Sequence, residues 1–285
     1  MDLCNQKEIK ELLGRHGFRF SKSMGQNFLI APWVPQQTAE ASGAAPGVGV
    51  LEIGPGIGPL TEQLALRAEK VAAVELDRSL LPVLDETMAP YTNVEIVSGD
   101  ILKTDIPRLC EEKFGGLKTV ACANLPYNIT TPAITALLEA DCFETITVMI
   151  QREVALRICA EPGTAEYGAF TLLCQYYAER ELLYDVPPDC FYPAPKVTSS
   201  VIRLTRRGKP PVEVGNMDLF FRIVRAAFNQ RRKTLANALG QVTKDKDLIR
   251  AAISAAGLQE TVRGERLSFE EFAKIEQFFE ENGVA

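Results

Sequence analysis

The chain has 285 residues, of which 46% are hydrophobic and 24% charged, and its formal net charge is −6. This composition is typical of a globular protein with one large domain, or one domain plus a smaller one, and it shows no repeat or low-complexity segment. The sequence does not open with a basic segment followed by an apolar one, and no apolar run approaches the ~20 residues of a membrane span, so we expect neither a signal peptide nor a membrane partner.

Short apolar runs alternate with helical patterns through the first 205 residues. Most of these runs are rich in Val, Ile, Leu or Thr and are bounded by Gly, Pro, Asn or Asp, which is typical of strands. The predicted strands are Val48–Ile53, Val71–Glu75, Val94–Ser98, Thr119–Ala123, Thr145–Ile150, Glu181–Val186 and Val201–Thr205. Helical stretches such as Leu60–Arg67 and Ser79–Met88 separate the first five, which predicts an α/β fold with a mainly parallel sheet covered on both faces.

The helix after the fourth strand is predicted to begin at Pro132, with Thr131 as its N-cap residue. Residues 206–215 are rich in Pro, Gly and charge, as linkers are. Only helical patterns follow, and Ser268 with Glu271 forms a predicted capping box for the last of them. These patterns cover Asp218–Phe228, Thr234–Leu239, Leu248–Ala256 and Phe269–Glu280. We therefore predict an α/β domain over residues 1–206 and a small all-α domain over residues 207–285.

A glycine-rich loop joins the first predicted strand to the next helix. Residues 51–58 read LEIGPGIG, with glycines at Gly54, Gly56 and Gly58. Glycines let the backbone pass close to a ligand, and Glu75, at the end of the next strand, has a carboxylate that can accept hydrogen bonds from both hydroxyls of a ribose. Together they indicate a cofactor that contains a nucleoside, whereas the simpler alternative is a tight turn with acids that cap helices.

The spacing of the glycines favours one class of cofactor. In the dinucleotide fingerprint GxGxxG/A the last slot falls on Pro59, and the third glycine here comes one position early. This counts against NAD and suits S-adenosyl-L-methionine, which has no pyrophosphate. Asp100, at the end of the third strand, can accept a hydrogen bond from the adenine amino group of that cofactor. Ligands of open α/β sheets bind at the carboxyl ends of the strands, where all these residues fall.

Residues 124–127 read NLPY and end the fourth strand, which lies beside the first strand in the common open-sheet order. An exocyclic amine shares its lone pair with its ring, and two acceptors on its hydrogens can concentrate that pair toward a methyl donor. We assign the acceptors to the Asn124 side-chain oxygen and the Leu125 carbonyl, with Pro126 stiffening the turn and Tyr127 stacking on the base. Positioning and fixed dipoles then carry the catalysis. The alternative is an Asn-x-Pro turn followed by a core tyrosine.

The residues that commonly bind metals are few and scattered. The seven cysteines lie far apart without a CxxC pair, and His16 is the one histidine. We therefore expect neither a zinc site nor a disulfide framework, and no bound metal. Free and mostly buried thiols in a reducing cytoplasm are the interpretation that we favour, and His16 is assigned a structural or surface role.

Basic residues gather in one part of this acidic chain. From Lys196 to Lys233 there are ten Lys and Arg residues and two acids, whereas the rest of the chain holds 21 basic and 35 acidic residues. An acidic body with one basic sector is compatible with nucleic-acid binding, although basic segments are often only solvated faces.

The motifs resemble, almost from end to end, those of the ribosomal RNA adenine N6-dimethyltransferase family. The resemblance is greatest to its bacterial branch that acts on 16S rRNA of the small subunit and is associated with kasugamycin sensitivity. The matching stretches are GQNFL (25–29), LEIGPGIG (51–58), VELD (74–77), GD (99–100), NLPYNITTP (124–132), FYPAPKVTS (191–199), FNQRRKTL (228–235) and RGERLS (263–268). This resemblance implies a Rossmann-like, seven-stranded methyltransferase sheet and a helical C-terminal domain that binds rRNA.

The resemblance also implies site residues and partners. Phe191 is expected to cover the face of the target adenine opposite Tyr127. Cofactor contacts are expected from Asn27, Leu29, Gly54, Gly56, Glu75, Asp100 and Asn124, and RNA contacts from Arg222, Arg225, Arg231, Arg232 and Lys233. The implied reaction transfers two methyl groups to each of two adjacent adenines in a hairpin loop near the 3′ end of 16S rRNA, within the 30S subunit. We expect a cytoplasmic monomer that also acts late in small-subunit biogenesis.

Three alternatives stay open at this level. The large-subunit branch of the family, which confers macrolide resistance, typically has Ile in place of Leu125 and is usually shorter, so both features favour the small subunit. A ribosome-binding factor without catalytic activity and a dehydrogenase are the other two alternatives, and the glycine spacing counts against the dehydrogenase. The chain departs from the family, which is often basic, in its acidic net charge. We expect this charge to weaken non-specific RNA binding.

Overall fold

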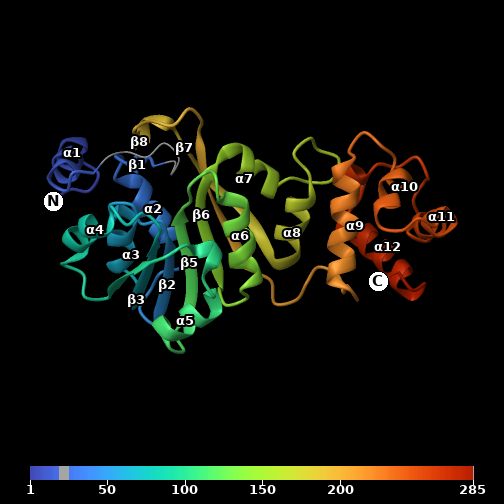
Figure 1. The fold of residues 1–285 in the computed structure, drawn as a ribbon, viewed down its shortest axis with the longest axis horizontal. Helices are drawn as coiled ribbons and strands as arrows, with labels where there is room; N and C mark the ends of the chain where they lie inside the picture. The colour runs from blue at the N-terminus through green and yellow to red at the C-terminus, as the bar shows by residue number, and fades with distance from the viewer. Residues whose placement is uncertain (19–25, 285) are drawn as a thin grey trace. The chain divides into compact units, whose positions relative to one another are not determined.

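The computed structural model describes residues 1–18 and 26–284 and divides the chain into two compact units. One unit contains Met1–Ala155 and Glu179–Arg206, and the other contains Leu156–Ala178 and residues 207–285 (Figure 1). Gly25, the first residue of the GQNFL stretch, lies outside the described residues. Each unit has its own apolar core and is treated separately below.

A seven-stranded sheet forms the centre of the first unit, in the order β4-β3-β2-β5-β6-β9-β7 (Figure 1). Its strands are β2 (Val48–Ile53), β3 (Lys70–Glu75), β4 (Val94–Ser98), β5 (Lys118–Asn124), β6 (Thr145–Gln151), β7 (Ala178–Val186) and β9 (Ser199–Arg206). Strands β2 to β6 pair in parallel, and β9 runs antiparallel to β6. The predicted α/β fold, its seven strands and the place of the fourth strand beside the first are confirmed. A separate two-stranded sheet pairs β1 (Phe28–Leu29) with β8 (Phe191–Tyr192).

Helices connect these strands. They are α2 (Trp33–Ala41), α3 (Pro59–Ala65), α4 (Leu81–Met88), α5 (Ile106–Phe114) and α6 (Thr130–Glu139), with short 3₁₀ turns η2 (Ile101–Lys103) and η3 (Pro188–Cys190). Helix α1 (Gln6–Arg15) precedes the first strand, and α7 (Arg152–Ile158) follows β6 and ends in the other unit. All six residues of β2 are buried, as expected for a central strand covered on both faces. A Cβ atom at Gly49 of β2 would lie 2.5 Å from the Phe114 ring, so the small residue lets α5 pack closely on the sheet.

The predicted start of α6 was wrong by two residues. The helix begins at Thr130, and its N-cap residue, Ile129, provides no side-chain cap. The chain enters the helix through a turn, in which the Ile129 amide donates to the Pro126 carbonyl at 3.1 Å. Pro132 is accordingly the third helical residue, a position where no intrahelical partner for an N–H group exists and a proline costs little.

Helices make up the second unit. They are α8 (Ala169–Tyr177), α9 (Met217–Asn229), α10 (Leu235–Ala238), α11 (Lys246–Ala255) and α12 (Phe269–Glu281), with the turns η4 (Leu239–Gln241) and η5 (Gly264–Arg266). The predicted capping box of α12 is confirmed, because the Ser268 amide donates to Glu271 at 2.7 Å and the Glu271 amide donates to Ser268 at 3.3 Å. No helix among the described residues is long and apolar enough to cross a membrane.

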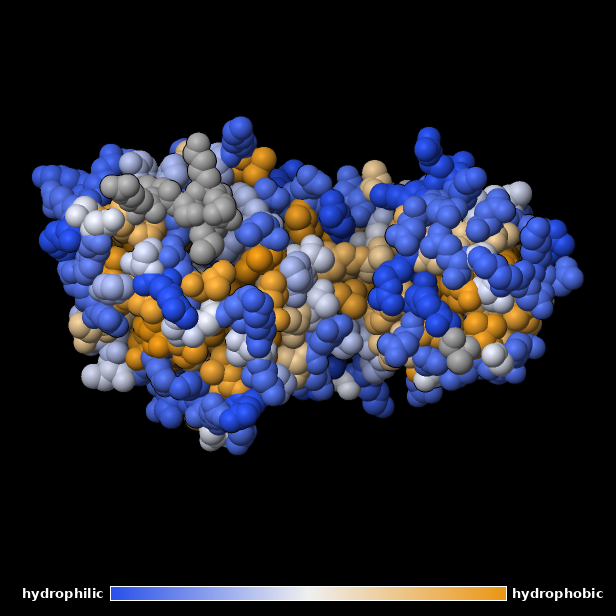
Figure 2. Space-filling model, in the orientation of Figure 1, coloured by the Kyte–Doolittle hydropathy of each residue, from blue (hydrophilic) through white to orange (hydrophobic). Residues whose placement is uncertain are grey.

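The division between the units differs from the predicted boundary by one segment. Residues 156–178 belong to the helical unit, although they precede β9 in the chain. Tyr167 is fully buried in the core of that unit, where its hydroxyl donates to the Leu267 carbonyl at 2.8 Å. Figure 2 shows that hydrophilic side chains cover most of the visible face of each unit, with smaller apolar patches between them.

Candidate active site

The loop between β2 and α3 turns sharply through its three glycines. Gly54, Gly56 and Gly58 have φ angles of 66°, 64° and 99°, a region that residues with a Cβ atom rarely adopt. The Gly54 amide donates to the Val74 carbonyl at 2.9 Å, and a Cβ atom at Gly58 would lie 2.4 Å from the end of the Met88 side chain. The glycines are therefore required by the turn itself, and the turn brings backbone close to the end of β3.

Glu75 ties the end of β3 to this loop. One carboxylate oxygen accepts a hydrogen bond from the Asp77 amide at 2.7 Å, and the other accepts one from the Gly56 amide at 3.3 Å. The side chain is buried, and burial raises the pKa of the carboxyl above its usual value. Each oxygen of a carboxylate has a second lone pair, so Glu75 can still accept hydrogen bonds from a ligand.

Asp100 has two roles at the end of β4. It is the N-cap residue of η2, where Oδ1 accepts from the Leu102 amide at 3.0 Å, and Oδ2 lies 3.6 Å from the Lys103 ammonium. Its side chain also lines the cavity that contains Glu75. The helix-capping alternative considered for this acid is thus correct locally, and it does not prevent contact with a ligand.

The NLPY turn begins at the end of β5. The Leu125 amide donates to the Met149 carbonyl of β6 at 3.1 Å, which holds the turn to the sheet. Within the described residues, neither the Asn124 side chain nor the Leu125 carbonyl has a hydrogen-bond partner. The Tyr127 hydroxyl lies 2.9 Å from the hydroxyl of Ser199 on β9, a contact that fixes the direction of the tyrosine ring. Two acceptors are therefore available on one turn beside an oriented aromatic ring.

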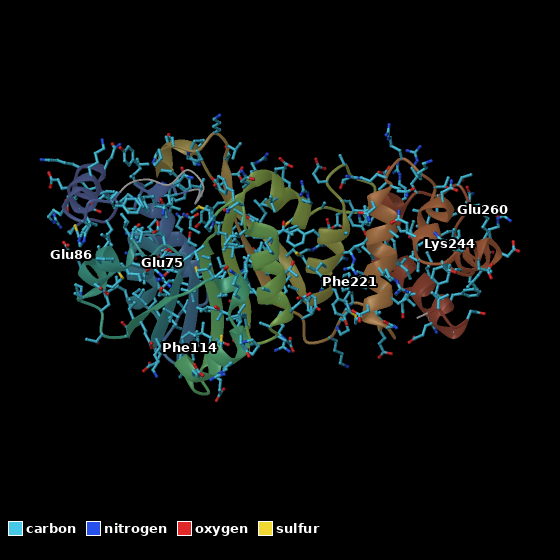
Figure 3. All side chains as sticks on the ribbon, in the orientation of Figure 1. Glu75, Glu86, Phe114, Phe221, Lys244 and Glu260 are labelled. Carbon is cyan, nitrogen blue, oxygen red and sulfur yellow. The ribbon has the colours of Figure 1, made fainter. Side chains whose placement is uncertain are left out.

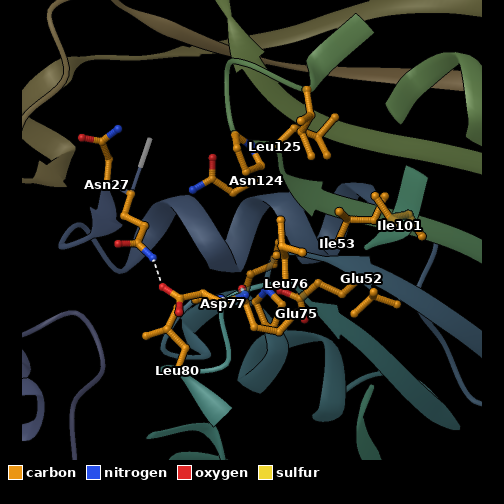
Figure 4. A pocket seen from close by; sticks show the side chains of 18 of the residues that line it. Asn27, Glu52, Ile53, Glu75, Leu76, Asp77, Leu80, Ile101, Asn124 and Leu125 are labelled. Atoms are coloured by element: carbon orange, nitrogen blue, oxygen red, sulfur yellow. Dashed lines mark hydrogen bonds between the residues drawn. The ribbon is translucent and has the colours of Figure 1, made fainter. Parts of the chain in front are cut away.

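A single cavity collects the residues that were predicted for cofactor binding and catalysis (Figure 4). Its lining includes Asn27, Leu29, Gly54, Gly56, Glu75, Asp100, Asn124, Leu125, Pro126, Tyr127 and Phe191. It lies at the carboxyl ends of β2, β3 and β5, where an open sheet binds ligands. The fold thus brings the predicted residues together, whereas their individual roles stay predictions.

Phe191 contributes less open surface to the cavity than a stacking wall requires. Leu29 and Phe191 are paired residues of β1 and β8, so the two-stranded sheet brings both to the cavity. The phenylalanine is only 3% exposed and belongs to an apolar cluster with Met149 and Val201. Tyr127, which is half-buried, is the more accessible of the two aromatic residues.

Sequence reasoning missed Glu52, which also lines the cavity. This residue of β2 is fully buried, its Oε2 atom has no hydrogen-bond partner within the described residues, and burial raises its pKa to about 8. A charged residue inside the apolar run VGVLEI was the available signal, because an ionisable group is seldom buried without a purpose.

Two exposed leucines of the cavity lie within two residues of the predicted acids. Leu76 and Leu102 are 51% and 41% exposed, which is unusual for leucines, and both line the cavity beside Glu75 and Asp100. Gln26 donates to the Asp77 carboxylate at 2.7 Å, the contact drawn as a dashed line in Figure 4. The cavity therefore has polar groups at the strand ends and apolar side chains next to them.

The basic residues predicted to contact RNA lie in the helical unit. Arg222 and Arg225 are exposed and lie one turn apart on α9, whose opposite face is buried. Arg232 and Lys233 are exposed as well. Arg231 differs from the others, because its guanidinium donates to the Ala165 and Tyr167 carbonyls at 2.7 and 3.1 Å. These contacts make Arg231 an anchor for the segment before α8.

His16 has a carboxylate partner that the sequence did not indicate. Its Nε2 atom lies 2.7 Å from Glu86 on α4, the residue labelled in Figure 3, and Arg15 binds the other oxygen of the same carboxylate. The hydrogen bonds from His16 and Arg15 lower the pKa of Glu86. Among residues 1–18 and 26–284, no group of three or more His, Cys, Asp or Glu side chains is arranged to hold a metal ion.

Replacing Glu52 is expected to change how the free energy of unfolding depends on pH. The raised pKa means that Glu52 is neutral in the folded chain and ionised in the unfolded chain between about pH 4.5 and 8. Its stabilising contribution is therefore complete below pH 4.5 and is lost as the pH rises to 8, at about 1.4 kcal/mol per pH unit. Urea unfolding of the wild type and of Glu52→Gln at pH 5, 6, 7 and 8 measures this difference. Parallel stability curves for the two proteins would contradict the assignment.

The chain matches known proteins over almost its whole length. The family described as ribosomal RNA adenine dimethylase matches residues 17–281. The chain is 45% identical over 276 residues to ribosomal RNA small subunit methyltransferase A of Alkaliphilus oremlandii, which covers 96% of each protein. It is 46% identical over 284 residues to the protein of the same name from Lachnoclostridium phytofermentans, which covers 98% of each.

Solved structures share the fold. The 23S rRNA methyltransferase ErmE is 28% identical, with a TM-score of 0.68 over 89% of this chain and 100% of the other. A dimethyladenosine transferase from Plasmodium falciparum superposes with a TM-score of 0.73 over 90% of this chain and 98% of the other. Its 23% identity shows the fold alone.

Proposed function

The chain belongs to the ribosomal RNA adenine dimethylase family of S-adenosyl-L-methionine-dependent transferases, and we propose that it dimethylates the N6 amines of two adjacent adenines in a hairpin loop near the 3′ end of 16S rRNA. One observation supports the site above all others. The unpartnered Asn124 side chain and Leu125 carbonyl line the same cavity as the glycine loop and Glu75. The relatives from Alkaliphilus and Lachnoclostridium, both named as small subunit methyltransferases, support 16S rRNA over 23S rRNA.

The lining of the cavity fits S-adenosyl-L-methionine. The carboxylates of Glu75 and Asp100 suit the ribose hydroxyls and the adenine amino group, and the exposed Leu76 suits the flat face of the adenine. The unpartnered oxygen of Glu52 suits the ammonium of the cofactor, because a buried carboxylate is stabilised by an opposite charge. When bound, this cofactor supplies an electrophilic methyl group.

Asn124 and Leu125 then hold the target amine. Their two oxygens accept hydrogen bonds from the two N–H groups of the amine. These bonds align the nitrogen lone pair toward the methyl donor and stabilise the positive charge that develops on the nitrogen during transfer. After the first transfer one N–H remains, so a single acceptor orients the amine for the second. Pro126 restricts the turn that carries both acceptors, and Ser199 holds the Tyr127 ring on which the base stacks.

The wider setting follows from the same proposal. The enzyme acts as a cytoplasmic monomer on the 30S subunit, late in its biogenesis. A loop base is already partly unstacked, so moving it into the cavity costs less than it would from a duplex. The exposed arginines of α9 suit the phosphates around that loop.

Removing two exposed arginines is expected to lower the affinity for RNA and to make that affinity less dependent on salt concentration. Arg225→Ala combined with Arg232→Ala removes two charges for which the described residues provide no partner. The slope of log K against log salt is expected to fall in magnitude by about 2, because each phosphate contact releases about one counterion. Filter binding to 30S particles at several salt concentrations measures the slope. Lys244→Ala, which removes an exposed charge from the same unit, is the control, and equal slopes in all proteins would contradict the assignment.

Mapping the methylated positions tests the proposed substrate. Unmethylated 30S and 50S subunits are incubated separately with enzyme and S-adenosyl-L-methionine, and primer extension then locates the stops. We expect stops at two adjacent adenines of 16S rRNA and none in 23S rRNA. Stops only in 23S rRNA would instead assign the chain to the large-subunit branch, and an enzyme without stops on either would be a binding factor.

A further inference from the structure

Two of the seven cysteines meet in the fold although 32 positions separate them. The sulfur of Cys142 lies 3.7 Å from that of Cys110, which is van der Waals contact between sulfur atoms. We propose that Cys110 and Cys142 form a peroxide-reactive dithiol that closes to an intramolecular disulfide, a modification site separate from the methyltransferase cavity. A disulfide has an S–S distance of about 2.0 Å, so the two sulfurs have to approach by about 1.7 Å to close it.

The backbone on both sides keeps these sulfurs close. Cys110 lies on α5, which packs on the sheet, and Cys142 lies in the connection between α6 and β6. The Cys142 carbonyl accepts a hydrogen bond from the Thr119 hydroxyl of β5. The neighbouring Asp141 pairs with Arg206 of β9 at 2.7 Å. The two thiols are therefore held together by secondary structure, and the reduced protein already has them in position.

The two thiols differ in exposure and in pKa, and these differences determine which of them reacts first. Cys142 is partly exposed and Cys110 is buried, so a dissolved oxidant reaches Cys142 first. The hydrogen bond between the sulfurs lowers the pKa of the Cys142 thiol, and the same bond together with burial raises that of Cys110. A lower pKa increases the thiolate fraction, which is the form that attacks. Cys142 is thus the reactive thiol and Cys110 the resolving one.

Hydrogen peroxide is the oxidant that balances the reaction. The Cys142 thiolate attacks one peroxide oxygen, the O–O bond breaks, and a sulfenic acid and water form once a proton is taken up. Cys110 then loses its proton, its sulfur attacks the Cys142 sulfur, and hydroxide leaves as water. In total, two thiols and one peroxide give one disulfide and two waters, with two electrons passing from sulfur to oxygen.

The bridge would close a loop that contains β5, the Asn124–Tyr127 turn and α6. Neither cysteine lines the cavity. Figure 3 shows Phe114, the last residue of α5, well separated from Glu75, at the edge of the sheet where β5 begins. We therefore expect oxidation to tie together the ends of the segment that carries the catalytic turn while leaving the ligand site unchanged.

Peroxide treatment of the full-length protein tests the proposal. After quenching with iodoacetamide, a non-reducing digest is expected to contain a Cys110–Cys142 cross-linked peptide that is two hydrogens lighter than the two thiol peptides. The Tm is expected to rise by about 5 °C or more on oxidation, and to return to the value of the reduced protein when dithiothreitol is added. The Kd of S-adenosylhomocysteine is expected to change less than twofold.

Single variants separate this pair from the other thiols. Cys142→Ser and Cys110→Ala are expected to abolish the cross-linked peptide and the rise in Tm, whereas Cys4→Ser, at another partly exposed cysteine, keeps both. Sulfenic or sulfinic acid at Cys142 without a bridge, or a bridge to a different cysteine, would overturn the proposal. The wild-type digest decides the outcome even where a variant folds poorly. Cofactor affinity is measured separately, so failure of the dithiol is distinguishable from failure of the proposed methyl transfer.

Discussion

Asn124→Ala is expected to lower the rate of methyl transfer to unmethylated 30S particles by about 10²- to 10³-fold. The variant removes one of two acceptors that orient the amine, and loss of one preorganised polar contact at a reacting centre costs about this much. The expected loss lies mainly in kcat, because the acceptor is needed most when charge develops on the nitrogen. Single-turnover transfer of tritiated methyl groups measures it, with the Kd of S-adenosylhomocysteine as a second readout.

Asn128→Ala is the matched control for this experiment. Asn128 has the same side chain, lies in the same turn and lines the same cavity, and it has no assigned role. Its variant is expected to transfer methyl groups within a few-fold of the wild-type rate. A wild-type rate for Asn124→Ala would contradict the assigned acceptor. Weaker cofactor binding by Asn124→Ala, with a wild-type transfer rate once the cofactor is saturating, would make Asn124 a cofactor ligand alone.

Glu75→Ala is expected to weaken binding of S-adenosylhomocysteine by about 10²-fold or more. The carboxylate is assigned to two ribose hydroxyls, and hydrogen bonds to a charged group contribute about 1.5–3 kcal/mol each. The variant also removes the acceptor for the Gly56 and Asp77 amides, which loosens the glycine loop. Isothermal titration calorimetry measures the Kd, and urea unfolding of the free protein shows how much of the loss comes from the loop.

The pH dependence of the same Kd separates ribose binding from a structural role. Burial raises the pKa of Glu75, so the carboxylate becomes protonated as the pH falls through a value above the usual 4.5, and affinity falls with it. Glu75→Gln keeps the size of the side chain but does not titrate. In this variant, the fall in affinity that Glu75 protonation causes at low pH is expected to be absent. Tight binding by Glu75→Ala at every pH would place the cofactor elsewhere.

Much of the sheet could be predicted because its strands are short apolar runs with clear ends. The cavity followed from the same patterns, since the carboxyl ends of β2, β3 and β5 must meet at one edge of a parallel sheet. The start of α6 could not be read from Thr131 and Pro132, because the helix begins two residues earlier without a side-chain cap, directly after the turn that starts at Pro126. The grouping of residues 156–178 with the helical unit could not be predicted, because a sequence pattern does not show which core a buried Tyr167 enters.

Individual side chains were harder to assign than elements. Arg231 and Arg232 are adjacent and identical in chemistry, yet only the first binds backbone carbonyls of another segment. Glu52 was read as part of an apolar strand, and its unpartnered oxygen depends on the packing around it. The contact of Cys110 with Cys142 likewise depends on how α5 packs, which spacing along the chain does not reveal. Tertiary packing decided each of these cases.

Mass spectrometry of nucleosides from 16S rRNA, after reaction with a trideuteromethyl donor, tests the central claim most directly. Unmethylated 30S particles are incubated with the wild type or with Asn124→Ala, and the RNA is digested to nucleosides. With the wild type we expect N6,N6-dimethyladenosine in which both methyl groups carry the label, and with Asn124→Ala only a small fraction of that amount. Label on another base or another atom of adenine, or equal amounts from the two proteins, would contradict a cavity in which Asn124 and Leu125 orient the N6 amine.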